Sequence, residues 1–387
     1  MFYAIPYPKH SKNEHAQMPQ KKKKILISVT NDLSNEYRMH KTALWLIEQG
    51  FEVEIIGRKK KNSPKLPKTP YKANRLVLPF EKGVWFYASY NLTLFFVLLF
   101  LRYDILLSVD LDTLLSNFLA SKIRKKRLIY DSHEYFTELP ELVHRPKVKK
   151  VWYWIEKWIF PKLKYVYTVS HSIAQEYQQK YGVDVKVVRN IPQLSLIQES
   201  IPLHVANLQR KYGKKILLYQ GAVNIGRGLE AIIDAIPELD YVLVILGNGD
   251  ILDELKQQVA QKNLTDKVHF LGHISLSDLP YYTAQARIGL CLLDKNMGKS
   301  YQYALPNKLF EYLYAGIPVL ATSMTEIKQF IDTYKVGKYI NNHQVRDIKE
   351  GIEEIEKNYS FYVQNCKETQ KKISWVEELS KVKMFFE

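Results

Sequence analysis

Short apolar runs alternate with longer amphipathic segments along most of the chain, in two successive series. Apolar runs of this length between helical patterns indicate strands, which the first series places at residues 25–29, 53–56, 76–78, 105–107, 128–130, 166–169 and 185–188. The second series places strands at residues 216–219, 241–246, 268–271, 288–292 and 319–321, and helices at 229–236, 251–261, 276–286 and 307–315. Two strand–helix series predict an α/β protein with two doubly wound, mostly parallel sheets.

A break between the series divides the chain. Asn190-Ile-Pro192 has the pattern of a chain break, and no strand signal follows until Ile216. A length of 387 residues also exceeds what one core usually holds. We expect a disordered polar tail over residues 1–20, an N-terminal Rossmann-like domain over 21–192 and a C-terminal Rossmann-like domain over 193–373. Ligands of such sheets bind at the carboxyl ends of strands, so a cleft between the domains is the expected site.

Charge is distributed unequally between the two halves. Residues 1–200 hold 33 Lys and Arg against 18 Asp and Glu, a net charge of +15, whereas residues 201–387 hold 23 against 22, a net charge of +1. The first half is expected to meet an anionic membrane surface, an anionic lipid-linked substrate or nucleic acid. A basic soluble surface without such a partner is the alternative.

Cysteine content and hydropathy limit the protein class. Cys291 and Cys366 are the only cysteines and have no neighbouring ligand at metal-binding spacing, which favours a reduced compartment. No signal peptide is visible in the polar first 20 residues. The most apolar stretch, residues 83–101, is interrupted by Ser89, Asn91 and Thr93, so we expect a buried or interfacial helix rather than a membrane span.

The segment over residues 305–322 has the strongest chemical pattern. Pro306 suits a first helical turn and Gly316 a helix end. Asn307, Lys308 and Glu311 then share one helix face, because residues three and four apart are neighbours. A helix N-terminus with an ammonium group can bind a nucleotide diphosphate, and a carboxylate one turn deeper can accept ribose hydroxyls. An ordinary amphipathic helix with a Lys–Glu surface pair explains the same pattern.

Glycine-containing turns follow the first two strands of the second series. Gly221, Arg227 and Gly228 lie between a strand and a helix, where glycine lets the backbone approach a phosphate and arginine can bind it bidentately. Neither the GxGxxG spacing nor a P-loop is present, so a dinucleotide site and a P-loop are not supported. Gly247 belongs to a second such turn. Close-packed turns without a ligand are the alternative.

Polar residues also follow strands of the first series. His133 lies at a strand end with Glu134 and Glu138 nearby and could bind a substrate hydroxyl, although a structural histidine is the alternative. Asp32 and Ser34 follow the first strand, where a turn and helix cap explain them equally well.

Two further patterns have a structural alternative. Asp110-Leu-Asp112 has the pattern of a metal-binding pair, but we interpret the first aspartate as a helix cap and expect no metal. Residues 147–160 mix lysine with tryptophan and tyrosine, which fits an interfacial helix. A core stripe of Val151, Trp154, Ile155 and Trp158 fits equally well.

Taken together, these segments resemble the retaining glycosyltransferases of family 4, which have the GT-B fold. The segments that carry the resemblance are Pro306-Asn-Lys-Leu-Phe-Glu-Tyr312, Ala315-Gly-Ile-Pro318, Tyr130-Asp-Ser-His-Glu134, Thr168-Val-Ser170, Asn190-Ile-Pro192, Arg227-Gly228 and Phe270-Leu-Gly272. The resemblance implies that Glu311 binds ribose, Arg227 and Lys308 bind the diphosphate, and His133 lies near the donor sugar.

The resemblance has further implications and two departures. Base recognition is implied at the backbone of His273 and Ile274, and residues of about 374–387 are implied to cross back onto the first domain. Tyr303 stands where the family has a first motif glutamate, which leaves sugar recognition open. Ala222 replaces a common arginine, so Arg227 and Lys308 would carry more of the phosphate charge.

The implied activity is transfer of a sugar from a nucleoside diphosphate sugar to a hydroxyl of a glycan or lipid-linked acceptor, with retention of configuration. The family implies no cofactor, no metal, and a role in cell-surface polysaccharide, lipopolysaccharide or glycolipid assembly. We expect a cytoplasmic protein that is peripheral on the inner face of an anionic membrane, with no nucleic-acid partner. A sugar-nucleotide epimerase of similar fold and a nucleic-acid-binding protein that uses the basic half are the alternatives.

Overall fold

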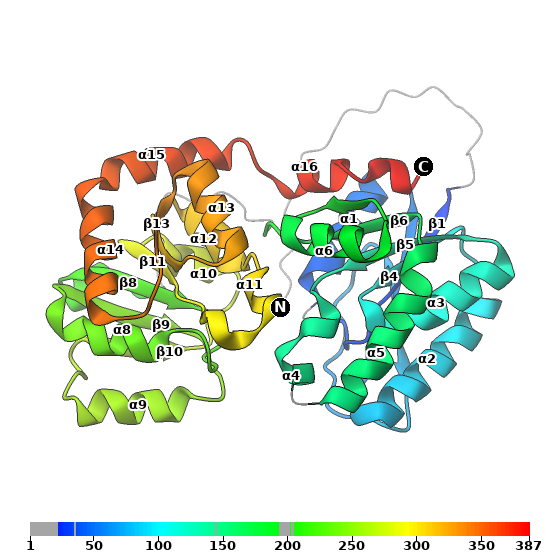
Figure 1. Cartoon of the computed structure of the whole chain (residues 1–387), viewed down its shortest axis with the longest axis horizontal. Helices are drawn as coiled ribbons and strands as arrows, with labels where there is room; N and C mark the ends of the chain where they lie inside the picture. The colour runs from blue at the N-terminus through cyan, green and yellow to red at the C-terminus, as the bar shows by residue number, and fades with distance from the viewer. Residues whose placement is uncertain (1–21, 35, 144, 193–201, 203–204) are drawn as a thin grey trace.

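The protein forms two α/β domains that lie side by side (Figure 1). The computed structural model describes residues 22–34, 36–143, 145–192, 202 and 205–387. The tail expected over residues 1–20 lies outside the described residues.

The first domain is built on a sheet of seven parallel strands in the order β3-β2-β1-β4-β5-β6-β7. Its strands are β1 (Lys24–Ser28), β2 (Glu52–Lys59), β3 (Lys72–Val77), β4 (Ile105–Val109), β5 (Arg127–Ser132), β6 (Tyr165–Thr168) and β7 (Val185–Val187). The order reverses between β1 and β4, and in this central register Ile27 pairs with both Ile55 and Leu107. The apolar side chains of these strands form the core because both faces of a parallel sheet are covered.

The second domain repeats this plan with six parallel strands in the order β10-β9-β8-β11-β12-β13. Its strands are β8 (Lys215–Gln220), β9 (Tyr241–Leu246), β10 (Val268–Gly272), β11 (Ile288–Cys291), β12 (Val319–Thr322) and β13 (Gly337–Ile340). The fold is therefore the predicted pair of doubly wound Rossmann-like domains, and every strand predicted from the sequence is confirmed within a few residues.

Helices cover both sheets. The first domain has α1 (Tyr37–Glu48), α2 (Gly83–Phe100), α3 (Leu111–Arg124), α4 (Pro140–Val143), α5 (Pro146–Ile159) and α6 (His171–Tyr181). The second has α7 (Leu208–Tyr212), α8 (Leu229–Ala235), α9 (Leu252–Gln261), α10 (Leu279–Thr283), α11 (Lys299–Gln302), α12 (Asn307–Ala315), α13 (Thr325–Tyr334), α14 (Val345–Lys357) and α15 (Tyr359–Gln370). The last helix in the chain, α16 (Trp375–Ser380), belongs to the first domain by its packing. Short 3₁₀ helices lie at Phe136–Glu138, Phe160–Lys162, Ile236–Glu238, Lys295–Met297 and Lys383–Phe385.

Strand β13 was not predicted from the sequence. Its four residues include only two buried side chains, so its hydrophobic pattern is too short to stand out. Pairing with β12 defines it instead, and a side chain at Gly337 would lie 2.0 Å from the Val319 carbonyl oxygen. The predicted helix over residues 276–286 is also shorter, since α10 covers only Leu279–Thr283.

The C-terminal residues leave the second domain and pack on the first, where α16 lies across the helices of the N-terminal domain (Figure 1). Trp375, Leu379, Val382 and Phe386 are buried with the core of β1, β2 and α1. The two passages between the domains are also joined to each other, because the Arg189 guanidinium donates to the carboxylate of Glu378.

Two helices of the first domain leave apolar side chains in solvent. In α2, Phe86, Tyr90, Leu94 and Leu98 are buried, and among the described residues this is the one helix long and apolar enough to cross a membrane by length and composition. In α5 the buried face contains Trp152, Ile155, Glu156 and Ile159. The alternative of a core stripe in α5 is therefore wrong, because Val151, Trp154 and Trp158 remain 58%, 62% and 37% exposed.

Candidate active site between the two domains

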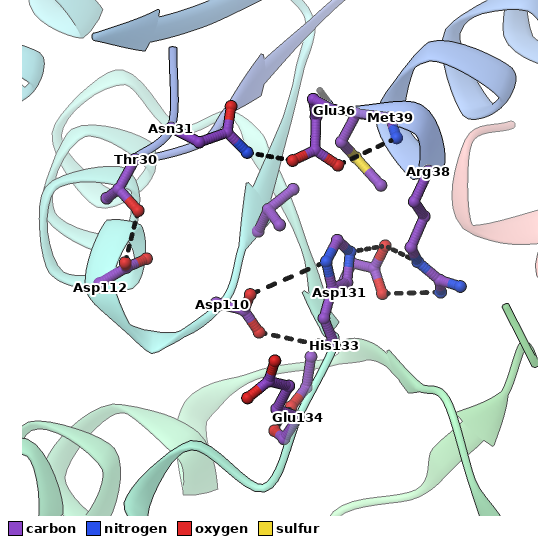
Figure 2. Close-up of polar contacts among 12 residues, drawn as sticks. Thr30, Asn31, Glu36, Arg38, Met39, Asp110, Asp112, Asp131, His133 and Glu134 are labelled. Atoms are coloured by element: carbon purple, nitrogen blue, oxygen red, sulfur yellow. Dashed lines mark hydrogen bonds and ion pairs between the residues drawn. The ribbon is translucent and has the colours of Figure 1, made fainter. Parts of the chain in front are cut away.

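The N-terminal side of the site is a chain of charged side chains at the carboxyl ends of β4 and β5 (Figure 2). His133 Nε2 lies 3.0 Å from Asp131 Oδ2, and the His133 backbone N–H donates to Asp110 Oδ1 at 2.8 Å. Arg38 from α1 donates to both oxygens of Asp131, at 3.2 and 3.0 Å. The sequence predicted His133, whereas Arg38, Asp110 and Asp131 join it only because three separate segments meet at one sheet edge.

The charges of this network stabilise one another. Burial alone would raise the pKa of Asp131, but Arg38 and His133 hold this pKa at about 2. Burial opposes a charge on His133, but Asp131 and Asp110 outweigh it and raise the pKa of the imidazole to about 9. These contacts favour the protonated imidazole of His133, and in that form it donates hydrogen bonds.

The interpretation of Asp110 as a helix cap is wrong. It stands at the N-terminus of α3 but makes no side-chain cap hydrogen bond there. Its carboxylate instead accepts from His133, and Oδ2 lies 3.8 Å from the imidazole Nδ1. Its backbone has φ 56° and ψ 170°, a conformation that is costly for any residue except glycine and that occurs preferentially at functional sites. Burial raises the pKa of the Asp110 carboxyl to about 8.

The other acidic residues of this edge have structural partners. Asp112 Oδ2 accepts a hydrogen bond from Thr30 Oγ1 at 2.6 Å. Asp32 accepts from the Ser34 backbone at 3.1 Å, which is the predicted turn, but the N-cap of α1 is Glu36. Within the described residues, no group of three or more His, Cys, Asp or Glu side chains is arranged to hold a metal ion.

On the C-terminal side, the loop after β8 carries Gly221, Arg227 and Gly228. The Arg227 guanidinium lies 5.0 Å from the Tyr301 ring centre, and its Nε is buried without a hydrogen-bond partner in the described part of the chain. Gly228 has φ 72°, and a side chain there would lie 2.2 Å from the Leu292 carbonyl oxygen. Close packing thus requires glycine at position 228.

Lys308 lies at the start of α12, beside this loop. It is 8% exposed, and its Nζ lies 3.7 Å from the Tyr219 ring centre and 3.4 Å from where a Gly221 Cβ would stand. Burial together with Arg227 lowers the pKa of its ammonium to about 8, although the charge of Glu311 opposes this shift without an ion-pair contact among the described residues. The alternative of a Lys–Glu surface pair is therefore wrong, whereas Asn307 is exposed at the first position of the helix.

Glu311 lies one turn after Lys308 on α12. Its Oε2 accepts a hydrogen bond from Gln220 Nε2, and Gln220 Oε1 accepts one from Thr283 Oγ1 at 2.8 Å. Burial raises the pKa of the Glu311 carboxyl. Sequence reasoning missed Gln220, although its place as the last residue of β8, directly before Gly221, was a usable signal.

The remaining predicted residues lie along the same sheet edge. Gly247 follows β9, and a side chain there would lie 1.9 Å from the Gly221 carbonyl oxygen, so the two predicted glycine turns are in contact. His273 and Ile274 follow β10, the edge strand. His273 is exposed, and Ile274 packs partly against the core.

Side chains from the two sides meet between the domains. The Arg227 charge opposes the rise in the pKa of Glu134 that burial causes, so these residues lie within electrostatic range across the interface. Tyr303 reaches the first domain, where its hydroxyl donates to Glu176 Oε1 at 2.7 Å and its ring stacks on Tyr135 with centres 6.4 Å apart. The position that departs from the family pattern is thus an interdomain contact.

Comparisons with known proteins agree with this architecture. The family model described as "Glycosyltransferase Family 4" matches residues 36–193, and the model described as "Glycosyl transferases group 1" matches residues 201–373. The D-rhamnosyltransferase WbpZ of Pseudomonas aeruginosa is 36% identical over 70 residues, which cover 18% of each chain. The chain spans between 18% and 51% of the length of the curated relatives it matches.

Two solved structures show the fold over nearly the whole chain. Anabaena Alr3699/HepE, solved with UDP and glucose, has a TM-score of 0.69 at 13% identity and covers 93% of this chain and 98% of its own. WaaG, a glycosyltransferase involved in lipopolysaccharide biosynthesis, has a TM-score of 0.66 at 14% identity and covers 93% and 99%. With family models matched on both domains, the chain belongs to the family 4-like glycosyltransferases of the GT-B fold.

Proposed function

We propose that the protein transfers a sugar from a nucleoside diphosphate sugar to a hydroxyl of a glycan or lipid-linked acceptor, with retention of anomeric configuration. The observation that carries the proposal is Lys308, a buried ammonium group that has no carboxylate within ion-pair distance in the described structure and has a second cation, Arg227, within electrostatic range. An isolated buried charge is costly unless a ligand pairs with it. The start of a helix favours a phosphate as that ligand.

The donor would lie along the carboxyl edge of the second sheet. Lys308 and Arg227 bind the diphosphate, and the carboxylate of Glu311, held by Gln220, accepts the ribose hydroxyls. The backbone at His273 and Ile274 meets the base, beyond the turn at Gly247. As the bond to the anomeric carbon breaks, negative charge develops on the leaving diphosphate, and the two cations stabilise it.

The protonation state of His133 is consistent with a retaining reaction. Its contacts with Asp131 and Asp110 favour the cationic imidazole, so the acceptor's proton is proposed to pass to another group. His133 instead donates a hydrogen bond to a hydroxyl of the donor sugar. The acceptor oxygen attacks the face that the diphosphate leaves, and its proton passes to an oxygen of the departing diphosphate.

The acceptor is proposed to be anionic and membrane-linked. The protein is proposed to be cytoplasmic and to meet an anionic acceptor at the inner face of the membrane, which the net charge of +15 in residues 1–200 supports. Each basic residue near the membrane surface contributes about 1 kcal/mol of attraction. A role in polysaccharide or lipopolysaccharide assembly is proposed in line with the lipopolysaccharide biosynthesis in which WaaG is involved and with the sugar transfer by WbpZ. Arg227 and Lys308 supply the charge that a divalent ion would bring to the diphosphate, so transfer is proposed to need no metal, cofactor or nucleic acid.

The proposal is tested by a thermal-shift panel of nucleoside diphosphates and their sugars, followed by product analysis. A stabilising nucleotide is expected, and Glu311→Ala and Arg227→Ala are expected to abolish transfer while the protein stays folded. Normal turnover by both variants would refute the assignment of the donor site. Incubation with donor alone separates the alternative epimerase, which would change the sugar without any acceptor, and EDTA tests the absence of a metal.

A further inference from the structure

Helix α2 carries an apolar stripe that nothing in the described structure covers. The helix has no charged residue over its 18 positions. Trp85, Leu92, Phe96 and Phe100 are 70%, 60%, 51% and 86% exposed. Their spacing of seven, four and four residues places them on one helix face, opposite the buried side chains, over a length of about 22 Å.

Helix α5, which packs near α2 and α3, also leaves apolar side chains exposed. Tyr87 of α2 contacts Trp152 of α5, with ring centres 5.1 Å apart, and Phe118 of α3 contacts Trp158 of α5 at 5.7 Å. Helix α5 adds Val151 and Trp154, which are more than half exposed. We refer to the exposed side chains of Trp85, Leu92, Phe96, Phe100, Val151 and Trp154 as the apolar face. Helix α2 lies on the flank of the first domain away from the second domain (Figure 1).

The charges around the apolar face are mostly basic, although Glu81 and Asp104 lie near the two ends of α2. On α2, α3 and α5 the acidic residues are Asp112 and Glu156, and both are buried. The exposed charged residues of these helices are all basic, namely Lys122, Lys147, Lys150 and Lys157. Exposed Lys82 and Arg102 flank the two ends of α2. An apolar stripe with a basic surround is the pattern of a helix that lies in the interface of an anionic bilayer.

We infer that the apolar face inserts into an anionic lipid bilayer and anchors the first domain to it. Helix α2 does not span the bilayer in this state, because its inner face packs on Leu26, Ile56 and Leu106 of the sheet and both of its ends return to neighbouring strands. A second copy of the chain fits the face poorly, since a symmetric contact would place like charges opposite each other. The apolar face would be the part of the protein that contacts the membrane in the proposed function. Only the lipid-linked nature of the acceptor rests on that proposed function.

Vesicle sedimentation with the full chain tests this inference. Wild-type protein is expected to bind vesicles of phosphatidylcholine and phosphatidylglycerol better than phosphatidylcholine alone. The variant F96E/F100E is expected to bind at least tenfold more weakly in both low and high salt, because it removes insertion. The variant K150E/K157E is expected to lose binding mainly in low salt, where charge attraction is least screened. The matched control is F361E, which changes a Phe that is 55% exposed on α15 of the other domain and should bind like wild type.

Three outcomes would overturn the inference. The first is unchanged vesicle binding by F96E/F100E, and the second is an equal loss in F361E. The third is a wild-type dimer, seen by sedimentation velocity without vesicles, that F96E/F100E dissociates. Thermal shifts with the panel of nucleoside diphosphates on the same samples keep the two proposals separate. Vesicle binding without a nucleotide response would support the apolar face as a membrane anchor and refute the proposed donor site. A nucleotide response without vesicle binding would support the donor site and refute the membrane anchor.

Discussion

The two sides of the interdomain site treat buried charge differently. On the N-terminal side, Arg38, Asp131 and His133 form a chain in which each charge meets an opposite one within hydrogen-bond distance. On the C-terminal side, Lys308 is buried with only the Tyr219 ring beside its ammonium, and the Arg227 Nε has no partner among the described residues. Apart from Arg38 Nη1, the charged groups of the first side are satisfied by one another, whereas the cations of the second side have no acidic partner in contact among the described residues.

This contrast separates positioning from ligand binding. Paired buried charges fix the orientation of their side chains, and removal of one partner leaves the other uncompensated. Unpaired buried cations cost stability until an anion arrives, so part of the anion's binding free energy offsets that cost. The contrast predicts opposite effects of mutation on stability, and five experiments test it in order of decreasing effect.

The largest effect is expected for Asp131→Ala. This change leaves Arg38 and His133 buried without their shared partner, so the free energy of unfolding should fall by about 3–5 kcal/mol. Urea unfolding measures it. Lys308→Met is the control from the other side and should leave stability unchanged or higher. Equal destabilisation by both variants would contradict the contrast.

Lys308→Met is expected to lower sugar transfer about a hundredfold, which corresponds to about 3 kcal/mol of transition-state stabilisation. The reason is that one of the two cations facing the leaving diphosphate is lost. Steady-state rates with the donor identified by the thermal-shift panel measure the effect. Lys338→Met, at an exposed lysine of β13, should retain the wild-type rate, and an equal loss there would show that the effect is not specific to the site.

Nucleotide binding should depend on pH through Lys308. Because the pKa of this ammonium is lowered to about 8, it is charged below pH 8 and loses its proton above it in the free protein. A bound diphosphate favours the charged form, so binding at pH 9 should take up close to one proton, and the affinity for the nucleoside diphosphate found by the thermal-shift panel should fall as pH rises past 8. Calorimetry in buffers of different ionisation enthalpy measures this uptake, which should be absent in Lys308→Met.

Asp110→Ala should slow transfer about tenfold, because loss of a hydrogen bond to a charged group costs about 1.5 kcal/mol. The stability cost should be smaller than for Asp131→Ala, since the change removes a carboxylate whose pKa burial raises to about 8. Asp110→Asn retains an acceptor for the His133 N–H and should recover most of the rate. Failure of Asn to outperform Ala would show that the contact with His133 does not position the imidazole.

The smallest effect is expected for Tyr303→Phe, which removes one hydrogen bond between the domains. Its contribution is about 1 kcal/mol or less, so kcat/KM should fall less than about fivefold. The paired test is Glu176→Gln, which should weaken the same contact together with the 3.1 Å ion pair to Lys299. A large loss in Tyr303→Phe would indicate that the phenol contacts the donor sugar instead.

Much of the fold was predictable because local patterns of apolar and polar residues determine its strands and helices. Strands β8 to β12 were located from apolar runs of three to six residues, and α12 was located with its correct ends. The neighbouring positions of Lys308 and Glu311 followed from the helical period alone. Strand β13 was missed, since pairing with β12 rather than its own composition defines it.

The sequence by itself determined the two-domain α/β architecture, the helix that carries Lys308 and Glu311, and the excess of basic residues in the first half. Only the tertiary structure decided that Asp110 turns to His133, that Tyr303 reaches Glu176, and that one face of α2 stays exposed. The reason is that these features depend on contacts between residues far apart in the chain. A helix that is apolar on every side carries no periodic signal of which face meets the core, so packing alone reveals the face left for another partner.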